Sequence, residues 1–320
     1  MSKYTIGILG GSGFIGSFLA NELVERGHAI RILTRDREHA RHLWLLPDTE
    51  VIALDPYDQD QLNHAAAGLD GMVNLVGILN ERGDSGAGFR HAHVDLAVRV
   101  LKACKAAEVR RLVHMSALNA DSFAPSHYLR SKGEAEKLVL AEHSRRLAVT
   151  VLRPSVMFGP HDSFLNRFAR LLALCPGVFP LACAQARFQP IYVGDVAAVC
   201  LHALAAHAPD AARYDLGGPA ILSLREIVEY VARVIGRPVR IVELGPRLSA
   251  LQANLLEFVP GKPFSRDNLR SLQEDSVCAR GNGLEQLGIA PTPLEAIVPQ
   301  YLGGRQQRRR LYGFRVRARR

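Results

Sequence analysis

Two groups of residues in this 320-residue sequence have types and spacings suited to chemistry. Tyr128 and Lys132 stand four residues apart, and side chains at that spacing share one face of a helix. A neighbouring ammonium favours the phenolate and lowers the pKa of a tyrosine. Such a tyrosine can exchange a proton with a carbinol or a carbonyl while a nicotinamide exchanges a hydride. The pair predicts an oxidoreductase in which Lys132 also holds the nicotinamide ribose. The alternative is a surface lysine beside a half-buried tyrosine.

The second group is a glycine-rich turn. Residues 10–16 read Gly-Gly-Ser-Gly-Phe-Ile-Gly and fit two overlapping glycine patterns. Both patterns place backbone N–H groups against a pyrophosphate at the N-terminus of a helix. The alternative is a loop whose glycines only supply positive φ angles. We favour a nucleotide, and we predict that it contacts Gly10, Ser12, Gly13, Phe14, Ile15 and Gly16.

Further cofactor contacts are expected after the next three strands. Arg35 follows the second predicted strand, where an acid suits a ribose 2′-hydroxyl and an arginine suits a 2′-phosphate. This residue favours NADP(H) over NAD(H), because the guanidinium pairs with phosphate through a forked geometry. The alternative is a solvated charged loop. Asp55 is the candidate on the adenine side, and Val76 and Gly77 are the candidates beside the ribose and the pyrophosphate.

Short apolar strands alternating with amphipathic helices must position these residues. The strands are expected at residues 4–9, 30–33, 51–54, 72–76, 111–115 and 149–152. This rhythm predicts an α/β fold with a Rossmann-type, doubly wound parallel sheet over residues 1–155. Ser116 directly follows the fifth strand. Its hydroxyl either lies beside Tyr128 as a third catalytic group or only caps the end of the strand.

The remainder of the chain predicts a smaller, mostly helical lobe over residues 156–302, with residues 185–216 returning to the first domain. Helices are expected at 248–258 and 265–273, where they would cover a cleft. Several residues in and after the first of these helices are apolar. We interpret them as core, and the sharper alternative is a groove for an isoprenoid or a quinone. They are Leu251, Leu255, Leu256, Phe258 and Val259.

The net charge of +9 is concentrated at the C-terminal end. Residues 303–320 hold eight arginines and no acid, so the first 302 residues carry 9 − 8 = +1. A nearly neutral body gives no indication of specific nucleic-acid binding. The basic tail predicts contact with an anionic membrane surface or an acidic protein partner. The alternative is a tail that only improves solubility.

Composition narrows the class of protein. Apolar residues make up 48% and charged residues 22%, which excludes a disordered chain, a collagen and a coiled coil. Five cysteines without a Cys-x-x-Cys pair argue against a disulfide framework and a zinc ribbon, so no metal site is expected. The sequence shows neither a secretory signal nor a membrane span. We therefore expect a cytoplasmic protein, peripheral on the inner face of the membrane if the tail binds lipid.

Together these residues resemble the short-chain dehydrogenase/reductase superfamily, in its extended or atypical branch. The segments 153–160, 164–168, 190–196 and 287–295 are similar to the family of the NAD(P)H-binding accessory subunit of mitochondrial complex I and its bacterial relatives. The resemblance implies a Rossmann fold and tightly held NADP(H). It places the cofactor against Gly10, Gly13, Gly16, Arg35, Tyr128 and Lys132, with the segment from Pro154 onward near the nicotinamide.

The resemblance implies three functions. The first is an oxidoreductase, or an accessory or assembly factor, linked to quinone metabolism or the respiratory chain. In a catalytic form, Tyr128, Lys132 and Ser116 would act on a small-molecule or quinone-like substrate. The second is a non-catalytic structural subunit with bound NADPH. The third is a sugar-nucleotide epimerase or reductase. Extended enzymes usually carry a run of hydroxyls after the fifth strand, whereas Ala117 and Leu118 follow Ser116 here.

Overall fold

The computed structural model describes residues 3–175, 177–205, 212–259 and 262–303, and its contacts divide the chain into two compact units. Unit 1 comprises residues 1–154, 193–216 and 278–290, and unit 2 comprises the rest. The chain first leaves unit 1 after Pro154, next to the predicted boundary at residue 155. The segment 278–290 also returns to unit 1, and no sequence signal indicates that return.

Unit 1 is built on a seven-stranded sheet with the order β11-β6-β5-β4-β1-β2-β3, in which every neighbouring pair is parallel. This arrangement confirms the predicted Rossmann-type sheet. The direction of the strand order reverses between β1 and β4, and ligands of such sheets bind outside the carboxyl ends of the strands at that point. The strands are β1 (Thr5–Leu9), β2 (Ala29–Thr34), β3 (Thr49–Ala53), β4 (Gly71–Asn74), β5 (Arg111–Met115), β6 (Ala148–Pro154) and β11 (Ala212–Leu216).

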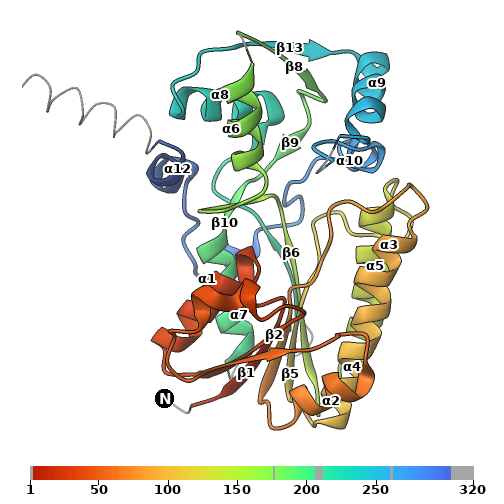
Figure 1. Cartoon of the computed structure of the whole chain (residues 1–320), viewed down its shortest axis with the longest axis vertical. Helices are drawn as coiled ribbons and strands as arrows, with labels where there is room; N and C mark the ends of the chain where they lie inside the picture. The colour runs from red at the N-terminus through yellow and green to blue at the C-terminus, as the bar shows by residue number, and fades with distance from the viewer. Residues whose placement is uncertain (1–2, 176, 206–211, 260–261, 304–320) are drawn as a thin grey trace, which may run out of the picture. The chain divides into compact units, whose positions relative to one another are not determined.

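Helices cover both faces of this sheet (Figure 1). On one side α1 (Phe14–Glu25) packs against α7 (Val193–Leu204). On the other side α4 (Leu96–Ala106) packs between α2 (Gln59–Ala66) and α5 (His127–Ala141). On the second side, mostly leucine, valine and alanine side chains of α2, α4, α5 and the strands form one buried cluster. The strands are buried on both faces, which explains why they appear in the sequence as continuous apolar runs.

Unit 2 has its own core of leucine, isoleucine, valine and phenylalanine side chains. Three helices build most of it: α6 (Leu165–Leu174), α8 (Leu224–Val234) and α12 (Leu294–Leu302). The strands of unit 2 pair only in twos, as β10-β7, β12-β9 and β13-β8. They are β7 (Met157–Phe158), β8 (Val178–Ala182), β9 (Arg187–Phe188), β10 (Ile191–Tyr192), β12 (Leu222–Ser223) and β13 (Arg240–Leu244).

Unit 2 has two further helices, α9 (Pro246–Leu256) and α10 (Arg266–Ser271). They correspond to the helices predicted at residues 248–258 and 265–273, and their bounds differ from the predicted ones by one or two residues. The interpretation of the apolar residues in and after α9 as core is wrong for four of the five. Leu251, Leu255, Phe258 and Val259 are exposed, and Leu256 is half-buried. The helix instead buries Ser249 and Ala253, so its large apolar side chains point away from the unit.

Among the described residues, no helix is both long and apolar enough to span a bilayer. The eight arginines of the basic tail lie outside the described residues, as Arg305 is the first of them.

Candidate functional site

The glycine turn connects β1 to α1 in unit 1. Gly10 has a φ of +82°, a backbone conformation that costs glycine nothing. A Cβ atom on Gly16 would lie 2.5 Å from Cα of Gly11 and 2.6 Å from the carbonyl oxygen of Gly10. Both neighbours are backbone atoms, so the turn itself must move if Gly16 gains a side chain. The first turn of α1 therefore lies directly against the loop, as close helix–strand packing requires.

The N-terminus of α1 is free to meet an anion. Gly13 stands at the N-cap, and none of the described side chains caps the first turn. The first N–H groups of a helix have no intrahelical partner, and the helix dipole favours negative charge beside them. Phe14 and Ile15 contribute two of these groups. Ser12 is half-buried, and its Oγ lies 3.2 Å from Oγ1 of Thr34 at the end of β2. An uncapped helix N-terminus of this kind can hold an anion such as a pyrophosphate.

Arg35 follows Thr34 directly and is exposed. Its guanidinium makes no hydrogen bond or ion pair with any other residue that the structure describes. It lies near Tyr57, where its positive charge opposes the burial that raises the pKa of that phenol. Asp55 is also exposed, but its carboxylate already accepts the N–H of Tyr57 at 2.9 Å. Of the two side chains, that of Arg35 is the one without a hydrogen bond to any other described residue.

The loop after β4 meets helix α5 at Gly77. A Cβ atom there would lie 3.1 Å from Nζ of Lys132 and 3.5 Å from Nε2 of His93. The N–H of Val76 donates to Oδ1 of Asn74 at 3.2 Å, which ties the loop to the end of the strand. The structure thus places the predicted residues Val76 and Gly77 beside Lys132. They stand at the carboxyl end of β4, next to β1 and its glycine turn.

Tyr128 and Lys132 lie one turn apart on α5, which is capped by the Ser126 side chain accepting the N–H of Leu129 at 3.1 Å. Lys132 is only 3% exposed, and its Nζ donates to the carbonyl oxygen of Met115 at 2.9 Å. Burial lowers the pKa of Lys132 to about 8. Burial also raises the pKa of Tyr128 to about 12. This direction is opposite to the lowered tyrosine pKa expected from the sequence, because burial disfavours the charged phenolate.

His93 joins the loop after β4 to α5. It lies in a π-helical turn (His91–Asp95) between α3 (Ala87–Arg90) and α4, and such turns are frequent at functional sites. Its Nε2 accepts the N–H of Ile78 at 3.1 Å, so its Nδ1 carries the proton and donates to Oγ of Ser131 at 2.8 Å. Burial, followed by the charge of Lys132, lowers the pKa of His93 to about 2. The ring is neutral and stands edge-on to Tyr128, with 5.7 Å between ring centroids.

A second buried histidine lies on β5. His114 is fully buried, and Nδ2 of Asn74 lies 3.3 Å from its Nδ1, while its Nε2 has no partner among the described residues. Burial and the charge of Lys132 lower the pKa of His114 to about 3. Lys132 is consequently the one group of the three that carries charge at neutral pH.

The hydroxyl of Ser116 donates to Oε2 of Glu136 at 2.8 Å. Glu136 lies one turn beyond Lys132 on α5 and forms ion pairs of 3.4 Å with Arg153 and Arg213. Arg153 also pairs with Asp215 at 3.3 Å, which links β6 to β11. The proton that Ser116 would need to polarise a substrate carbonyl is already given to this carboxylate. Of the two interpretations left open by the sequence, this contact favours a structural role at the end of the strand.

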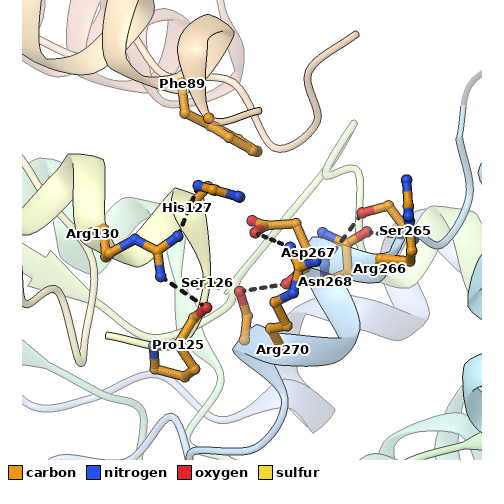
Figure 2. Close-up of polar contacts among 12 residues, drawn as sticks. Phe89, Pro125, Ser126, His127, Arg130, Ser265, Arg266, Asp267, Asn268 and Arg270 are labelled. Atoms are coloured by element: carbon orange, nitrogen blue, oxygen red, sulfur yellow. Dashed lines mark hydrogen bonds and ion pairs between the residues drawn. The ribbon is translucent and has the colours of Figure 1, made fainter. Parts of the chain in front are cut away.

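The loop before α5 is fixed by Arg130. Its Nη1 donates to the carbonyl oxygens of Ala124 at 2.9 Å and Pro125 at 3.1 Å, and its Nη2 lies 2.8 Å from Nδ1 of His127 (Figure 2). Pro154 ends β6, is buried, and its carbonyl oxygen accepts the N–H of Leu118 at 3.1 Å. Both contacts hold the carboxyl ends of the central strands in place. Neither His93 nor Glu136 belongs to a sequence motif, so no local signal indicates their place in the site.

Comparisons with known proteins agree with the fold. The family model described as "NAD dependent epimerase/dehydratase family" matches residues 6–217. Subunit 9 of the NADH dehydrogenase [ubiquinone] 1 alpha subcomplex, a mitochondrial protein of Rattus norvegicus, is 31% identical over 297 residues, which cover 90% of this chain and 77% of that protein. The 2-alkyl-3-oxoalkanoate reductase of Stenotrophomonas maltophilia is 28% identical over 260 residues, or 72% of this chain and 76% of the reductase.

Solved structures share the fold. The dTDP-glucose 4,6-dehydratase DesIV of Streptomyces venezuelae, determined with NAD bound, superposes with a TM-score of 0.72 at 19% identity. The match covers 93% of this chain and 95% of that one.

Proposed function

Since this chain belongs to the NAD dependent epimerase/dehydratase family, we propose that unit 1 binds a nicotinamide dinucleotide and prefers NADP(H) to NAD(H). The observation that carries the proposal is an uncapped helix N-terminus behind a turn that only glycine can form, with Arg35 exposed at the end of the next strand. The residues of this edge of the sheet fit the cofactor. A Cβ atom at Gly16 would meet the backbone of the turn, and one at Gly77 would meet Nζ of Lys132.

Each predicted contact has a role in this proposal. The amide groups of the turn and of the first residues of α1 hold the pyrophosphate, and Arg35 holds the 2′-phosphate. Asp55 lies on the adenine side. Val76, Gly77 and Lys132 hold the nicotinamide ribose, with Pro154 beside the ring. When bound, the cofactor supplies or accepts a hydride.

The test measures dissociation constants for NADPH and NADH by titration of the purified protein, after any bound nucleotide has been removed and identified. We expect NADPH to bind more tightly. Arg35→Ala should weaken NADPH binding about tenfold or more and leave NADH unchanged, because charge-assisted hydrogen bonds contribute about 1.5–3 kcal/mol. The matched control is Arg37→Ala, which removes an exposed arginine that lies over the ring of Trp44. Tighter binding of NADH would refute the preference.

For the chemistry we propose an oxidoreductase linked to quinone metabolism or the respiratory chain. The rat relative is named for an NADH dehydrogenase [ubiquinone] and the Stenotrophomonas relative is named as a reductase, which supports this direction. In this scheme Tyr128 keeps its proton at neutral pH and gives it to a carbonyl oxygen, and Lys132 orients the ribose. Oxidation of NADPH by added quinones or carbonyl compounds, abolished in Tyr128→Phe, would support this scheme.

A second candidate is a non-catalytic protein with NADPH as a structural ligand. The hydrogen bond from Ser116 to Glu136 favours it, because this hydroxyl is not available to a substrate. In that case stoichiometric NADPH would stay reduced with every substrate while raising the melting temperature. A sugar-nucleotide epimerase or reductase is the third candidate, and binding of a nucleotide sugar would identify it.

We also propose that the basic tail at residues 303–320 attaches the protein to an anionic membrane surface. Its eight arginines and lack of acids support this, since each basic residue near such a surface contributes about 1 kcal/mol. Flotation with anionic liposomes should fall when residues 303–320 are removed. Equal flotation without the tail would dismiss its role in membrane attachment.

A further inference from the structure

Helix α9 of unit 2 carries its large apolar side chains on the outside. Five apolar residues in and directly after it are more than 40% exposed, among them Leu255 at 63% and Phe258 at 89%. At about 100° per residue, all five fall within an arc of roughly 100°. Hydrogen bonds from the N–H groups of Glu257, Phe258 and Val259 continue the turn past the end of the helix. We call this surface the α9 face: Leu248, Leu251, Leu255, Phe258 and Val259.

The inner side of the same helix is small and polar. Ser249 and Ala253 are buried, the Ser249 hydroxyl donates to the carbonyl oxygen of Leu244 at 3.1 Å, and Nε2 of Gln252 donates to the carbonyl oxygen of Pro180 at 3.2 Å. An ordinary surface helix has the opposite arrangement, with its apolar stripe toward the core. Contacts within unit 2 therefore hold the α9 face outward.

The exposed charge within the α9 segment is positive. Between Gly245 and Val259 the exposed charged residue is Arg247, and the only acid is Glu257. Glu257 is buried and forms ion pairs with Arg266 at 2.7 Å and Lys262 at 3.7 Å. No exposed carboxylate of this segment would therefore oppose an anionic surface. An exposed apolar patch of this kind marks an interaction site.

From this arrangement we propose that the α9 face docks on the surface of an anionic phospholipid bilayer, with the helix lying in the plane of the interface. Apolar side chains would enter the boundary between headgroups and acyl chains, and Arg247 would meet the anionic headgroups, as in interfacial helices. A bilayer interface suits this combination of large exposed apolar side chains with a cation and no exposed acid in the segment. The proposal does not depend on nucleotide binding. It differs from the proposal for the basic tail because it assigns the apolar contacts with the membrane to unit 2.

The first test measures sedimentation of the full chain with vesicles of phosphatidylcholine mixed with phosphatidylglycerol. Leu255→Ser/Phe258→Ser should lower the partition coefficient about tenfold or more, because interfacial binding scales with buried apolar area. The matched control is Leu45→Ser/Phe123→Ser, which removes one leucine and one phenylalanine of unit 1 that are 94% and 90% exposed. We expect the control to bind as the native chain does. Both double variants replace exposed side chains and should keep the native melting temperature.

A second measurement separates the α9 face from the basic tail. The chain has one tryptophan, Trp44, so Trp44→Phe/Phe258→Trp reports from the α9 face alone. On anionic vesicles we expect a blue shift and quenching by brominated lipids, and neither in Trp44→Phe/Phe123→Trp. Sedimentation without quenching at position 258 would overturn the proposal and leave the tail as the sole contact. Absence of sedimentation, or equal loss in both double-serine variants, would also overturn it. NADPH titration of the same samples shows separately whether unit 1 is intact.

Discussion

Replacement of Lys132 by methionine should remove a dependence of stability on pH that the native protein shows between pH 8 and pH 10. Lys132 is buried, with a pKa of about 8 against an ordinary value of 10.5. Between these two values the unfolded chain binds a proton that the folded chain does not. Stability therefore rises with pH across this window. From the two pKa values, the free energy of unfolding of the native protein should rise by about 2 kcal/mol from pH 8 to pH 10.

The assay is urea denaturation of nucleotide-free protein at both pH values. Lys132→Met keeps the length of the side chain and loses the charge, so the rise attributed to Lys132 should be absent from the variant. Groups that titrate in both proteins cancel in the comparison. The control, Lys137→Met, removes an exposed lysine on the same helix and should keep the native rise. If native protein and Lys132→Met gave the same pH dependence, Lys132 would not be desolvated and the account of its burial would be wrong.

Two further predictions concern Gly16 in the glycine turn and His93 beside Lys132. Gly16→Ala should weaken nucleotide binding at least tenfold and destabilise the protein by about 1–3 kcal/mol, because its methyl group meets the backbone of the turn. The control Gly245→Ala adds a Cβ that meets nothing within 4 Å, so it should leave nucleotide binding unchanged and cost only the small loss of an N-cap glycine. NADPH titration and urea denaturation measure the two effects. His93→Leu should cost about 1–3 kcal/mol at pH 7, because the N–H of Ile78 loses its acceptor. Below about pH 6.5 the histidine of the unfolded chain takes up a proton, whereas His93 in the folded protein stays neutral. The free energy of unfolding of the native protein therefore falls as the pH is lowered. In His93→Leu it should fall less steeply.

Local sequence signals were sufficient for the sheet of unit 1. A buried strand, a glycine turn and a helix determine their own positions, and the βαβ rhythm then limits the connections to the parallel arrangement that the structure has. The return of residues 278–290 to unit 1 could not be predicted in this way. It depends on close packing of Gly283 against Tyr214 of β11, where a Cβ atom would lie 2.8 Å from the tyrosine Cβ. No local pattern reports a contact of that kind.

The difference between local patterns and tertiary contacts also decides which side chains of the site could be predicted. Spacing identified Tyr128 and Lys132 because a helix brings such residues to one face, but spacing carries no information about hydration, which decides both pKa values. His93 and Glu136 meet the site through tertiary contacts from outside any motif. In α9 the sequence shows that apolar residues share a face but not which face the unit buries. The structure buries Ser249 and Ala253 instead, so the interpretation as core failed there.

We predict that nucleotide binding is linked to proton uptake through the buried cluster of His93, His114 and Lys132. His93 and His114 are neutral near pH 7, so Lys132 alone can change its charge there, and the carbonyl oxygen of Met115 is its partner. A ligand whose hydroxyl or phosphate oxygens accept from the ammonium stabilises the charged form and raises the pKa of Lys132 from about 8. Binding slightly above that pH must then take up a fraction of a proton per nucleotide, and affinity must fall as pH rises further. Calorimetry of NADPH binding in buffers of different ionisation enthalpy measures this uptake, and Lys132→Met should abolish it. An equal uptake in the variant would show that another group titrates and that the nucleotide does not contact Lys132.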